Sequence, residues 1–361
     1  MIQKKQIGIL TLHRAWNYGA VWQCWALKKV CEIFGYSAET IDYNPFGHRT
    51  LIEVLRHRPL VAYTYLSQMC FFERFVKQHL NPTMHSESHE WIKDNPPQDD
   101  IYVVGSDTVW SNDVVGPFLD SYLLDFAPSS VYRISYAAST GGKPLLLNDA
   151  QLAELRKFSA ISVREQQSVA DIQSRVAVPV ADVCDPTLLL TKEQYEPEEL
   201  MTRRRLPKHY IVNFNISGDP FCIESTRKIA HLLDLPIINL AGQYVHHISQ
   251  NYLTPIPEQR LYILHHADYV CTNSFHGACF SIIFRRPFVY AAVQSGGRSK
   301  TNGRAENLLN QTHLCDRYIT SLSDITPRIL DLDYKPSEPY IEEYRNRSHT
   351  WLKNAIKDES K

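Results

Sequence analysis

Short apolar runs that alternate with helix-like segments constrain the fold of this chain more than any other feature. Residues 7–12 are typical of a buried strand, residues 20–34 have helical periodicity, and residues 38–41 resemble a second strand. Gly35 lies where the first helix is expected to stop. This order of strand, helix and strand favours a parallel sheet with helices on its faces.

The same pattern recurs along the chain and restarts after a polar interval. In the first half, further strands are expected at 101–104, 133–139 and 160–163. In the second half, strands are expected at 210–214, 236–240, 267–271 and 287–291, and helices at 220–233 and 256–265. The charged interval 191–208 is expected to be a linker between two domains.

We therefore predict two Rossmann-like α/β domains, at 1–195 and 208–335, that face a cleft. Ligands of such folds bind outside the carboxyl ends of the strands. The first domain carries a helical insert at 51–80, and a last helical segment at 336–361 can cross back to the first domain.

Composition and charge exclude several classes of function. The chain has 361 residues with a net charge of -1, so no general attraction to nucleic acid is expected. No apolar stretch approaches the roughly 20 residues that span a bilayer, and the first apolar run is shorter than the core of a secretory signal. A cytoplasmic location is expected, with eight cysteines that form no CxxC pair and are expected to be buried thiols.

The insert at 51–80 is rich in aromatic and basic residues. Such a segment can touch a membrane surface from one side. Packing in the core or in the cleft is the favoured interpretation, and peripheral membrane contact is the alternative.

The most informative local motif is the segment 272–278, Thr-Asn-Ser-Phe-His-Gly-Ala, between an expected strand and an expected helix. Ser274, His276 and Gly277 then lie at a helix N-terminus, where unpaired N–H groups and the helix dipole favour anions. The alternative is that Ser274 only caps the helix and His276 is a packed core residue.

Other polar side chains also follow apolar runs. These candidates are Asn17, Asp107, Ser139, Arg164 and Arg304. Asp107 can act as a general base for a hydroxyl or can form a local turn. Arg164 can clamp a carboxylate or phosphate, or pair with Glu165. Trp110 can offer a sugar ring a flat platform, although core packing is the usual role of tryptophan.

Several well-known motifs are absent from the sequence. It contains no GxxxxGK[ST] phosphate loop, no GxGxxG after the first strand and no GxSxG nucleophile elbow. The doublets His246-His247 and His265-His266 lack a third ligand at a recognisable spacing, and adjacent helical residues are expected to point apart. The sequence therefore predicts no metal site.

Taken in order, the motifs resemble those of the polysaccharide pyruvyl transferase family. The matching segments are 7–13, 17–20, 104–110, 133–139, 161–165, 185–190, 267–270, 274–277 and 302–304. The resemblance implies a fold similar to GT-B glycosyltransferases. It also implies transfer of a pyruvyl group from phosphoenolpyruvate to two hydroxyls of one sugar, with release of phosphate. Acceptors in the family are glycans, often lipid-linked precursors of bacterial surface polymers, which places the reaction at the inner face of the membrane.

The resemblance also implies roles for the candidate residues. Arg164, Ser274, His276, Gly277 and Arg304 become donor contacts, with His276 as the acid that protonates the enol carbon. Asn17, Asp107, Trp110 and Ser139 become acceptor contacts in the first domain, with Asp107 as the base. No metal or nucleotide cofactor is implied.

One departure from the family pattern concerns the donor motif. Some branches have Arg-Leu-His where this chain has Ser274-Phe275-His276. The loss of that arginine removes one anion contact, and Arg304, Arg298 or Lys300 are candidates to replace it.

Two other functions compete with this interpretation. A glycosyltransferase that uses a sugar nucleotide has the same two-domain architecture, and fold alone does not fix function. A non-catalytic subunit of a glycan assembly complex is the third possibility.

Overall fold

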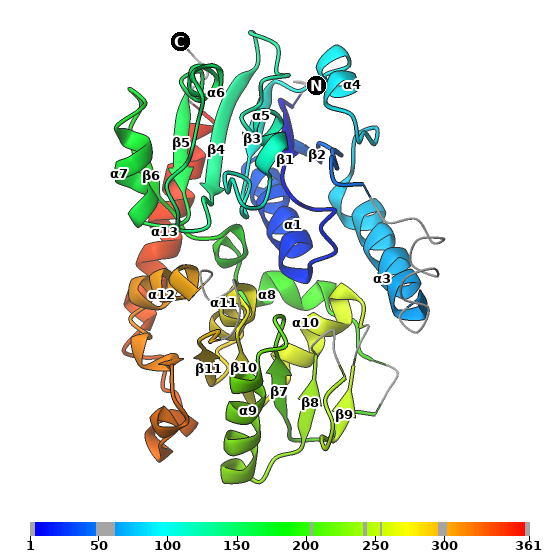
Figure 1. The fold of residues 1–361 in the computed structure, drawn as a ribbon, viewed down its shortest axis with the longest axis vertical. Helices are drawn as coiled ribbons and strands as arrows, with labels where there is room; N and C mark the ends of the chain where they lie inside the picture. The colour runs from blue at the N-terminus through cyan, green and yellow to red at the C-terminus, as the bar shows by residue number, and fades with distance from the viewer. Residues whose placement is uncertain are drawn as a thin grey trace. The chain divides into compact units, whose positions relative to one another are not determined.

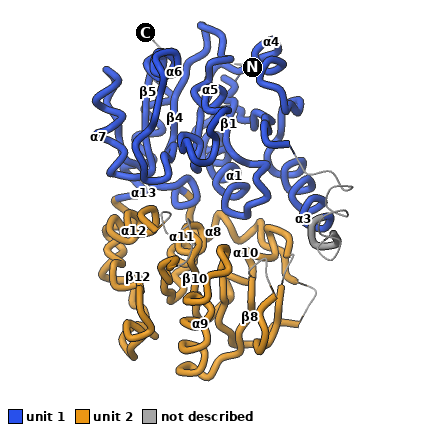
Figure 2. The backbone as a smooth tube through the Cα atoms, in the orientation of Figure 1, with its two compact units in different colours: residues 1–189, 344–361 blue, residues 190–343 orange. Residues whose placement is uncertain are grey.

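Two compact units make up the chain (Figure 2). The computed structural model describes residues 4–47, 62–202, 205–240, 244–252, 255–294 and 302–357. The first unit is Met1–Leu189 with Tyr344–Lys361, and the second is Leu190–Glu343. Within the described residues, each unit contains one six-stranded sheet whose neighbouring strands are all parallel. The α/β class expected from the sequence is confirmed.

The sheet of the first unit has the strand order β2-β1-β3-β4-β5-β6 (Figure 1). The strands are β1 (Gln6–Leu10), β2 (Ser37–Thr40), β3 (Ile101–Val104), β4 (Tyr132–Ala138), β5 (Ala160–Val163) and β6 (Val180–Asp182). The helices are α1 (Tyr18–Ile33), α3 (Ala62–Phe75), α4 (His89–Asp94), α5 (Leu119–Tyr122), α6 (Asp149–Leu155) and α7 (Gln167–Gln173). Shorter elements are a π-helix at Val76–Leu80 and 3-10 turns at Gly116–Phe118 and Pro186–Leu189.

Both faces of this sheet are covered. All four residues of β3 are buried, as expected for a central parallel strand. Tyr102 and Val104 pack in one cluster with Leu119 of α5 and Leu155 of α6. Figure 1 shows α5 and α6 in front of the sheet, and α1 behind it. This packing holds the strand ends in fixed positions.

The strand order reverses at β1. The chain passes from β1 outward to β2 and then returns to the other side of β1 for β3. In open α/β sheets, ligands bind at this switch point, outside the carboxyl ends of the strands. In the first unit the switch point therefore lies between the loops that follow Leu10 and Val104.

The sheet of the second unit has the order β12-β11-β10-β7-β8-β9. Its strands are β7 (Ile211–Phe214), β8 (Ile237–Asn239), β9 (Gln250–Asn251), β10 (Tyr269–Thr272), β11 (Phe288–Ala291) and β12 (Tyr318–Ile319). Its helices are α8 (Lys192–Tyr195), α9 (Pro220–Leu233), α10 (Pro257–His265), α11 (Phe275–Ile283) and α12 (Asn302–Gln311), followed by α13 (Glu338–Ala355) at the boundary between the units. Here the order reverses between β7 and β10, so the loops after Phe214 and Thr272 flank the switch point.

A chain of asparagine side chains fixes the register of three strands in this sheet. The Nδ2 group of Asn213 donates to Oδ1 of Asn239 at 2.9 Å, and Nδ2 of Asn239 donates to Oδ1 of Asn251 at 2.8 Å. The three residues are register partners in β7, β8 and β9. Because β8 and β9 are too short for apolar alternation to define their pairing, these hydrogen bonds specify it.

The polar interval expected to be a linker belongs to the second unit. It contains α8 and a 3-10 turn at Glu196–Glu198, within the range Leu190–Glu343. Tyr195 is fully buried, and its ring packs edge-on against Phe280 of α11, with 5.4 Å between centroids. The residues after Leu190 are thus held by the core of the second unit.

The last helix returns to the first unit. Tyr344 donates to the carbonyl of Val183 at 3.2 Å, and the Oγ of Ser348 accepts from the backbone N–H of Cys184 at 2.9 Å. Arg345 donates to the carbonyl of Leu188 at 2.8 Å. The C-terminal part of α13 therefore satisfies the backbone that follows β6.

Two further expectations are that the cysteines are buried thiols and that no segment spans a bilayer. All eight cysteines are free, and Cys70 and Cys315 are exposed, so burial is not general to the thiols. Among the described helices, none is both long and apolar enough to cross a bilayer. Of the insert expected at 51–80, residues 51–61 lie outside the described residues, and α3 with the π-helix covers the rest.

Candidate functional sites at the carboxyl edges of the sheets

The loop from β10 to α11 carries the Ser-Phe-His-Gly motif. Ser274 is the N-cap of α11, and its Oγ accepts from the N–H of Gly277 at 3.3 Å. The N–H of Ser274 itself donates to Oγ1 of Thr272 at 3.0 Å. Capping, the alternative role given to Ser274, is therefore present in the structure.

His276 lies in the first turn of the same helix. The residue is 6% exposed, and its ring contacts the ring of Phe275 edge-on at 5.2 Å. It is held beside the N-terminal N–H groups of α11, which form the positive end of the helix dipole. The sequence-based placement of His276 at a helix N-terminus next to a strand end is correct.

Gly277 allows α11 to approach the sheet closely. A Cβ atom at this position would lie 2.3 Å from Oγ1 of Thr272 and 3.0 Å from Cδ1 of Phe214. A larger residue fits only if the side chains of Thr272 in β10 and Phe214 in β7 move. The glycine thus brings the N-terminus of α11 against the carboxyl ends of both strands at the switch point.

The two loops that flank this switch point are hydrogen-bonded to each other through asparagines. Nδ2 of Asn273 donates to Oδ1 of Asn215 at 2.7 Å and to Oγ of Ser217 at 2.6 Å, and Oδ1 of Asn273 accepts from the N–H of Ile216 at 2.9 Å. Asn215 and Asn273 are both buried. Sequence reasoning missed this pair, although both residues directly follow a strand.

Arg304 also lies at the carboxyl edge of the second sheet. Oδ1 of Asn302 accepts from the N–H of Val293 at 3.1 Å, which ties the start of α12 to the residues after β11. Burial raises the pKa of Tyr290 in β11 above its usual range, and the charge of Arg304 opposes this effect. The other two proposed substitutes, Arg298 and Lys300, lie outside the described residues.

Arg164 in the first unit is surrounded by carboxylates. Its Nη1 lies 2.9 Å from Oδ2 of Asp185, its Nε lies 3.4 Å from Oε1 of Glu165, and its Nη2 lies 3.9 Å from Oδ1 of Asp107. Burial by itself lowers the pKa of the guanidinium, but these three carboxylates raise it above its usual value. The expected open clamp for an anion is therefore corrected: Arg164 is 2% exposed and already paired.

Asp107 and Ser139 belong to the same buried polar network as Arg164 and Glu165. Asp107 has a positive φ of 73°, and its Oδ1 accepts from the N–H of Thr108 at 2.8 Å, so the local turn foreseen for it is present. Asp107 is 8% exposed. The Oγ of Ser139 donates to Oε1 of Glu165 at 2.6 Å and is fully buried, so Ser139 positions Glu165.

Trp110 and Asn17 have opposite surroundings. Trp110 is fully buried, its Nε1 donates to the carbonyl of Tyr122 at 3.0 Å, and its ring packs edge-on against Phe158. It has no exposed face for a sugar, so the expected stacking platform is corrected to a core residue. Asn17 is exposed, and its Oδ1 accepts from the N–H of Gly19 at 2.9 Å as the N-cap of α1.

A cluster that sequence reasoning missed lies after β1 and β2. Nε2 of His13 and Nδ1 of His85 each lie 3.1 Å from Oδ1 of Asp42, and Nδ1 of His13 lies 3.1 Å from the carbonyl of Thr11. Both ring nitrogens of His13 therefore face hydrogen-bond acceptors. Burial raises the pKa of Asp42, but hydrogen bonds from His13 and Arg14 outweigh it and hold this pKa well below its usual range.

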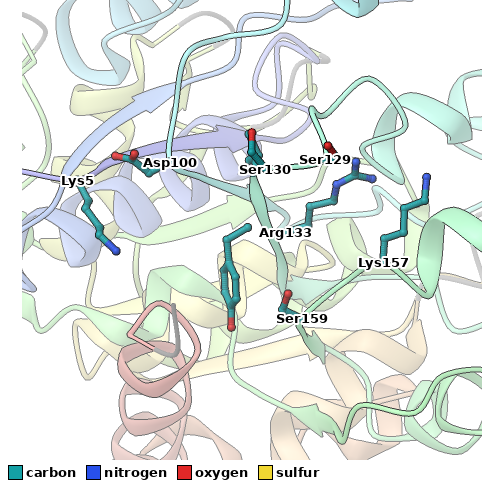
Figure 3. A pocket seen from close by; sticks show the side chains of 9 residues that line it. Lys5, Asp100, Ser129, Ser130, Arg133, Lys157 and Ser159 are labelled. Atoms are coloured by element: carbon teal, nitrogen blue, oxygen red, sulfur yellow. The ribbon is translucent and has the colours of Figure 1, made fainter. Parts of the chain in front are cut away.

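A separate hollow opens at the opposite edge of the first sheet (Figure 3). It is lined by Lys5, Asp100, Ser129, Ser130, Val131, Tyr132, Arg133, Lys157 and Ser159, which lie at or before the amino ends of the strands. Glu154 pairs with both Arg133, at 2.9 Å, and Lys157, at 2.6 Å. Glu154 offsets one of these two positive charges, and Asp100 offsets that of Lys5, so only a small excess of positive charge faces the hollow.

Comparison with known proteins decides the family. A sequence profile of polysaccharide pyruvyl transferases matches residues 17–295. The chain belongs to the polysaccharide pyruvyl transferase family. The matched part of this pyruvyl transferase family member contains Asn17, Asp107, Trp110, Ser139, Arg164, Ser274, His276 and Gly277, whereas Arg298, Lys300 and Arg304 lie beyond it. A comparison with curated proteins finds no match.

Solved structures support the fold of this pyruvyl transferase family member. UDP-GlcNAc 2-epimerase from Methanocaldococcus jannaschii is 11% identical, with 97% of this chain and 99% of that chain covered and a TM-score of 0.51. The epimerase from Neisseria meningitidis is 10% identical, with 98% and 99% covered and a TM-score of 0.52. The epimerase from Rickettsia bellii is 8% identical, with 99% and 97% covered and a TM-score of 0.52. At these identities the likeness shows the fold alone, and that fold is GT-B-like.

Proposed function

We propose that this protein transfers the pyruvyl group of phosphoenolpyruvate to two hydroxyls of one sugar, forming a cyclic ketal and releasing phosphate. Family membership over residues 17–295, which includes the Ser-Phe-His-Gly motif at the N-terminus of α11, is the observation that carries this proposal. The acceptor is a glycan, and we expect a lipid-linked precursor handled at the cytoplasmic face of the membrane.

The donor site is proposed at the start of α11. Phosphoenolpyruvate is small and carries several negative charges, so it needs N–H donors and cations. The first turn of α11, capped by Ser274, supplies N–H groups and a positive helix end. His276 and Arg304 supply the side chains. Arg164, already paired with carboxylates, is expected to contribute less to donor binding than the sequence suggested.

His276 is the proposed general acid. Its protonated imidazole gives a proton to carbon 3 of the enol, which leaves oxocarbenium character at carbon 2. A sugar hydroxyl attacks carbon 2 and loses its proton to a base, for which Asp107 is the candidate. The bond from carbon 2 to the phosphate oxygen then breaks, phosphate leaves, and a second hydroxyl of the same sugar closes the ring and loses its proton. This chemistry requires no redox step.

Product analysis tests the reaction. The purified protein is incubated with phosphoenolpyruvate and a panel of galactose-, glucose- and N-acetylmannosamine-containing acceptors, both lipid-linked and synthetic. We expect phosphate release together with an acceptor that has gained one pyruvate minus one water by mass. Turnover with a UDP- or GDP-sugar and no phosphate release from phosphoenolpyruvate would instead identify a glycosyltransferase. Unchanged biological function after His276→Ala and Arg164→Ala would favour a non-catalytic subunit.

Arg304 provides a test of how the chain compensates for the missing arginine of its donor motif. We expect Arg304→Ala to raise KM for phosphoenolpyruvate by about tenfold, since one charge-assisted contact to an anion is lost. Arg328→Ala, an exposed arginine of the same unit, is the matched control. An unchanged KM in Arg304→Ala would show that Arg304 does not replace the missing arginine.

A further inference from the structure

Two adjacent histidines at the C-terminal end of α10 converge on one glutamate. Nδ1 of His265 lies 2.6 Å from Oε1 of Glu199, and Nδ1 of His266 lies 3.9 Å from Oε2 of the same carboxylate. Glu199 lies 66 residues earlier in the chain, which is why sequence spacing did not reveal it. Within the described residues, this is the group of three histidine, cysteine or acidic side chains whose ligand atoms all lie within 4.8 Å of one another.

Aromatic neighbours orient both imidazoles. The ring of His265 stacks on Phe284, with 4.5 Å between centroids and an interplanar angle of 16°. The ring of His266 stacks on Tyr262 at 4.1 Å and 28°. The expectation that adjacent helical residues point apart is wrong for this doublet, because His266 is the C-cap of α10 and leaves the helical path.

The position also favours a cation. The C-terminus of α10 is the negative end of a helix dipole. The side chain of Glu199 is 7% exposed and that of His265 is 9% exposed, so the carboxylate and one imidazole are largely withdrawn from water. These two groups already pair with each other, so a metal ion must replace that contact by binding both of them at once.

We propose that Glu199, His265 and His266 bind a divalent transition metal ion, with zinc as the best fit. Two imidazole nitrogens and one carboxylate oxygen are a donor set that suits zinc and neighbouring first-row ions more than magnesium or calcium. With bonds of about 2.1 Å, tetrahedral ligand atoms lie about 3.4 Å apart. The three ligand atoms lie within 4.8 Å of one another, so side-chain movements of about an ångström bring them to this spacing.

Metal binding requires two proton changes. Nδ1 of His265 donates to Glu199, and Nδ1 of His266 lies 2.9 Å from the carbonyl of Tyr262, where it donates its hydrogen. Both protons must leave these nitrogens before they can act as ligands. The other ring nitrogen of His265, Nε2, lies 4.0 Å from Oε1 of Glu196, which is too long for a hydrogen bond.

The proposed metal site has a structural role and takes no part in the proposed pyruvyl transfer. It joins the segment around Glu199 to the end of α10 and, through Phe284, to the C-terminal end of α11. His276 lies at the other end of α11, about 13 Å away along a helix of this length. The bound ion is therefore expected to stabilise the second unit.

Zinc titration of untagged, chelator-treated protein tests the site. We expect calorimetry to show one zinc bound per chain, with a rise in melting temperature as the site fills, and no binding of magnesium. Glu199→Gln and His266→Ala should each weaken zinc binding by more than about 100-fold, because loss of a ligand exceeds the 10–100-fold effect of losing an outer-shell partner. His209→Ala is the matched control, since His209 forms a single exposed pair with Asp268 at 3.0 Å.

The outcomes separate a built site from adventitious binding. Binding that is lost in both variants and kept in His209→Ala supports the site, provided that the metal-free variants melt like the wild-type protein. Zinc binding that persists in Glu199→Gln or His266→Ala, or no binding by the wild-type protein, overturns the proposal. None of these results depends on whether the protein turns over phosphoenolpyruvate, so the site and the proposed reaction are tested independently.

Discussion

His276 is the residue on which the proposed chemistry depends most directly. It occupies the first turn of α11 and is 6% exposed, so its environment is fixed by the helix and the strand ends. The cap on that helix comes from Ser274 rather than from His276. A substitution at His276 therefore removes the imidazole without removing the cap.

We expect His276→Asn to lower the rate of phosphate release by about 10²–10⁴-fold, the usual effect of losing a general acid. Asparagine keeps a polar side chain of similar reach, so the fold should persist. Phosphate release at saturating phosphoenolpyruvate measures the effect, and circular dichroism checks the fold. His209→Asn, at the exposed pair with Asp268, serves as the control. A His276→Asn enzyme with wild-type turnover would remove His276 from the mechanism.

Asp99 is a second residue whose substitution has a predictable effect, on stability rather than on activity. It is 5% exposed, and burial, together with the charges of Glu39 and Asp100, raises its pKa to about 7. In the unfolded chain the carboxyl ionises near pH 4. Because the folded pKa is the higher one, stability is fullest below about pH 4 and is lost as pH rises to about 7.

Asp99→Asn should remove this pH dependence and stabilise the protein at pH 7.5 by roughly 2–4 kcal/mol. The amide can also donate to the nearby carboxylate of Glu39. Urea unfolding at pH 5 and pH 7.5 measures the difference. Asp94→Asn, at an exposed carboxylate, should keep the wild-type profile. Equal stabilisation at both pH values would contradict a raised pKa for Asp99.

Individual residues also mark the limit of what the sequence predicts. Motif order placed Ser274 and His276 correctly at a helix start, since both lie within seven residues of a strong strand signal. For Arg164 and Trp110 the sequence allows a ligand contact or a packed role, and the structure shows the packed one, with Arg164 beside Glu165 and Trp110 in the core. Their hydrogen-bond partners are Asp185 and the backbone carbonyl of Tyr122. Asp185 is distant from Arg164 in the sequence, and a contact to a backbone carbonyl leaves no sequence pattern, so no local signal revealed either contact.

Helix α11 packs closely against strands β10 and β7. Gly277 is where this helix meets β10 and β7, and Thr272 lies directly beneath it. Thr272 also donates through Oγ1 to the carbonyl of Phe214 at 2.8 Å, which links the two strands. These contacts hold the first turn of α11 against the carboxyl ends of β10 and β7.

We expect Gly277→Ala to destabilise the protein by about 1–3 kcal/mol, the usual effect of overpacking a core. The clash is with Oγ1 of Thr272, at 2.3 Å from the added Cβ atom. Thr272→Ala in the Gly277→Ala background should therefore cost less than the sum of the two single changes. A double-mutant cycle in urea measures the coupling. Strict additivity would argue against the predicted contact.

The sequence predicts helices with several periodic turns correctly, but it misses three of the shortest strands. The helix expected at 220–233 is α9, Pro220–Leu233, because Asp219 and Pro220 mark its start clearly. The strands β6, β9 and β12 have two or three residues each and were not predicted. Such short edge strands carry no alternation, and β9 is instead fixed by the hydrogen bond from Asn239 to Asn251.

The first unit is built from two separate parts of the chain, and the whole second unit lies between them in the sequence. The boundaries fall after Leu189 and after Glu343. The sequence predicted the two α/β units from the restart of the strand pattern, and it left open whether the last helix returns. The contacts of that helix, such as those of Tyr344 and Ser348, go to backbone groups, which no side-chain pattern reveals.

A stop codon after Glu343 tests the contribution of the returning helix. We expect the shortened protein to lose several kcal/mol of stability in its first unit, because the backbone groups of Val183, Cys184 and Leu188 lose buried hydrogen-bond partners. Hydrogen exchange read separately for β5 and β6 and for the second unit locates the loss. A stop codon after Lys357, which keeps all of α13, is the control. Equal exchange in both proteins would contradict the expected role of the helix.

This return of the chain sets an order of events during synthesis on the ribosome. The strands of the first unit emerge first, but the helix that completes it is made only after the whole of Leu190–Glu343. Domains generally fold as units while the chain is produced at about 5–20 residues per second. The second unit can therefore finish folding while the first waits, and chaperones that bind nascent chains should associate with the first unit for longer.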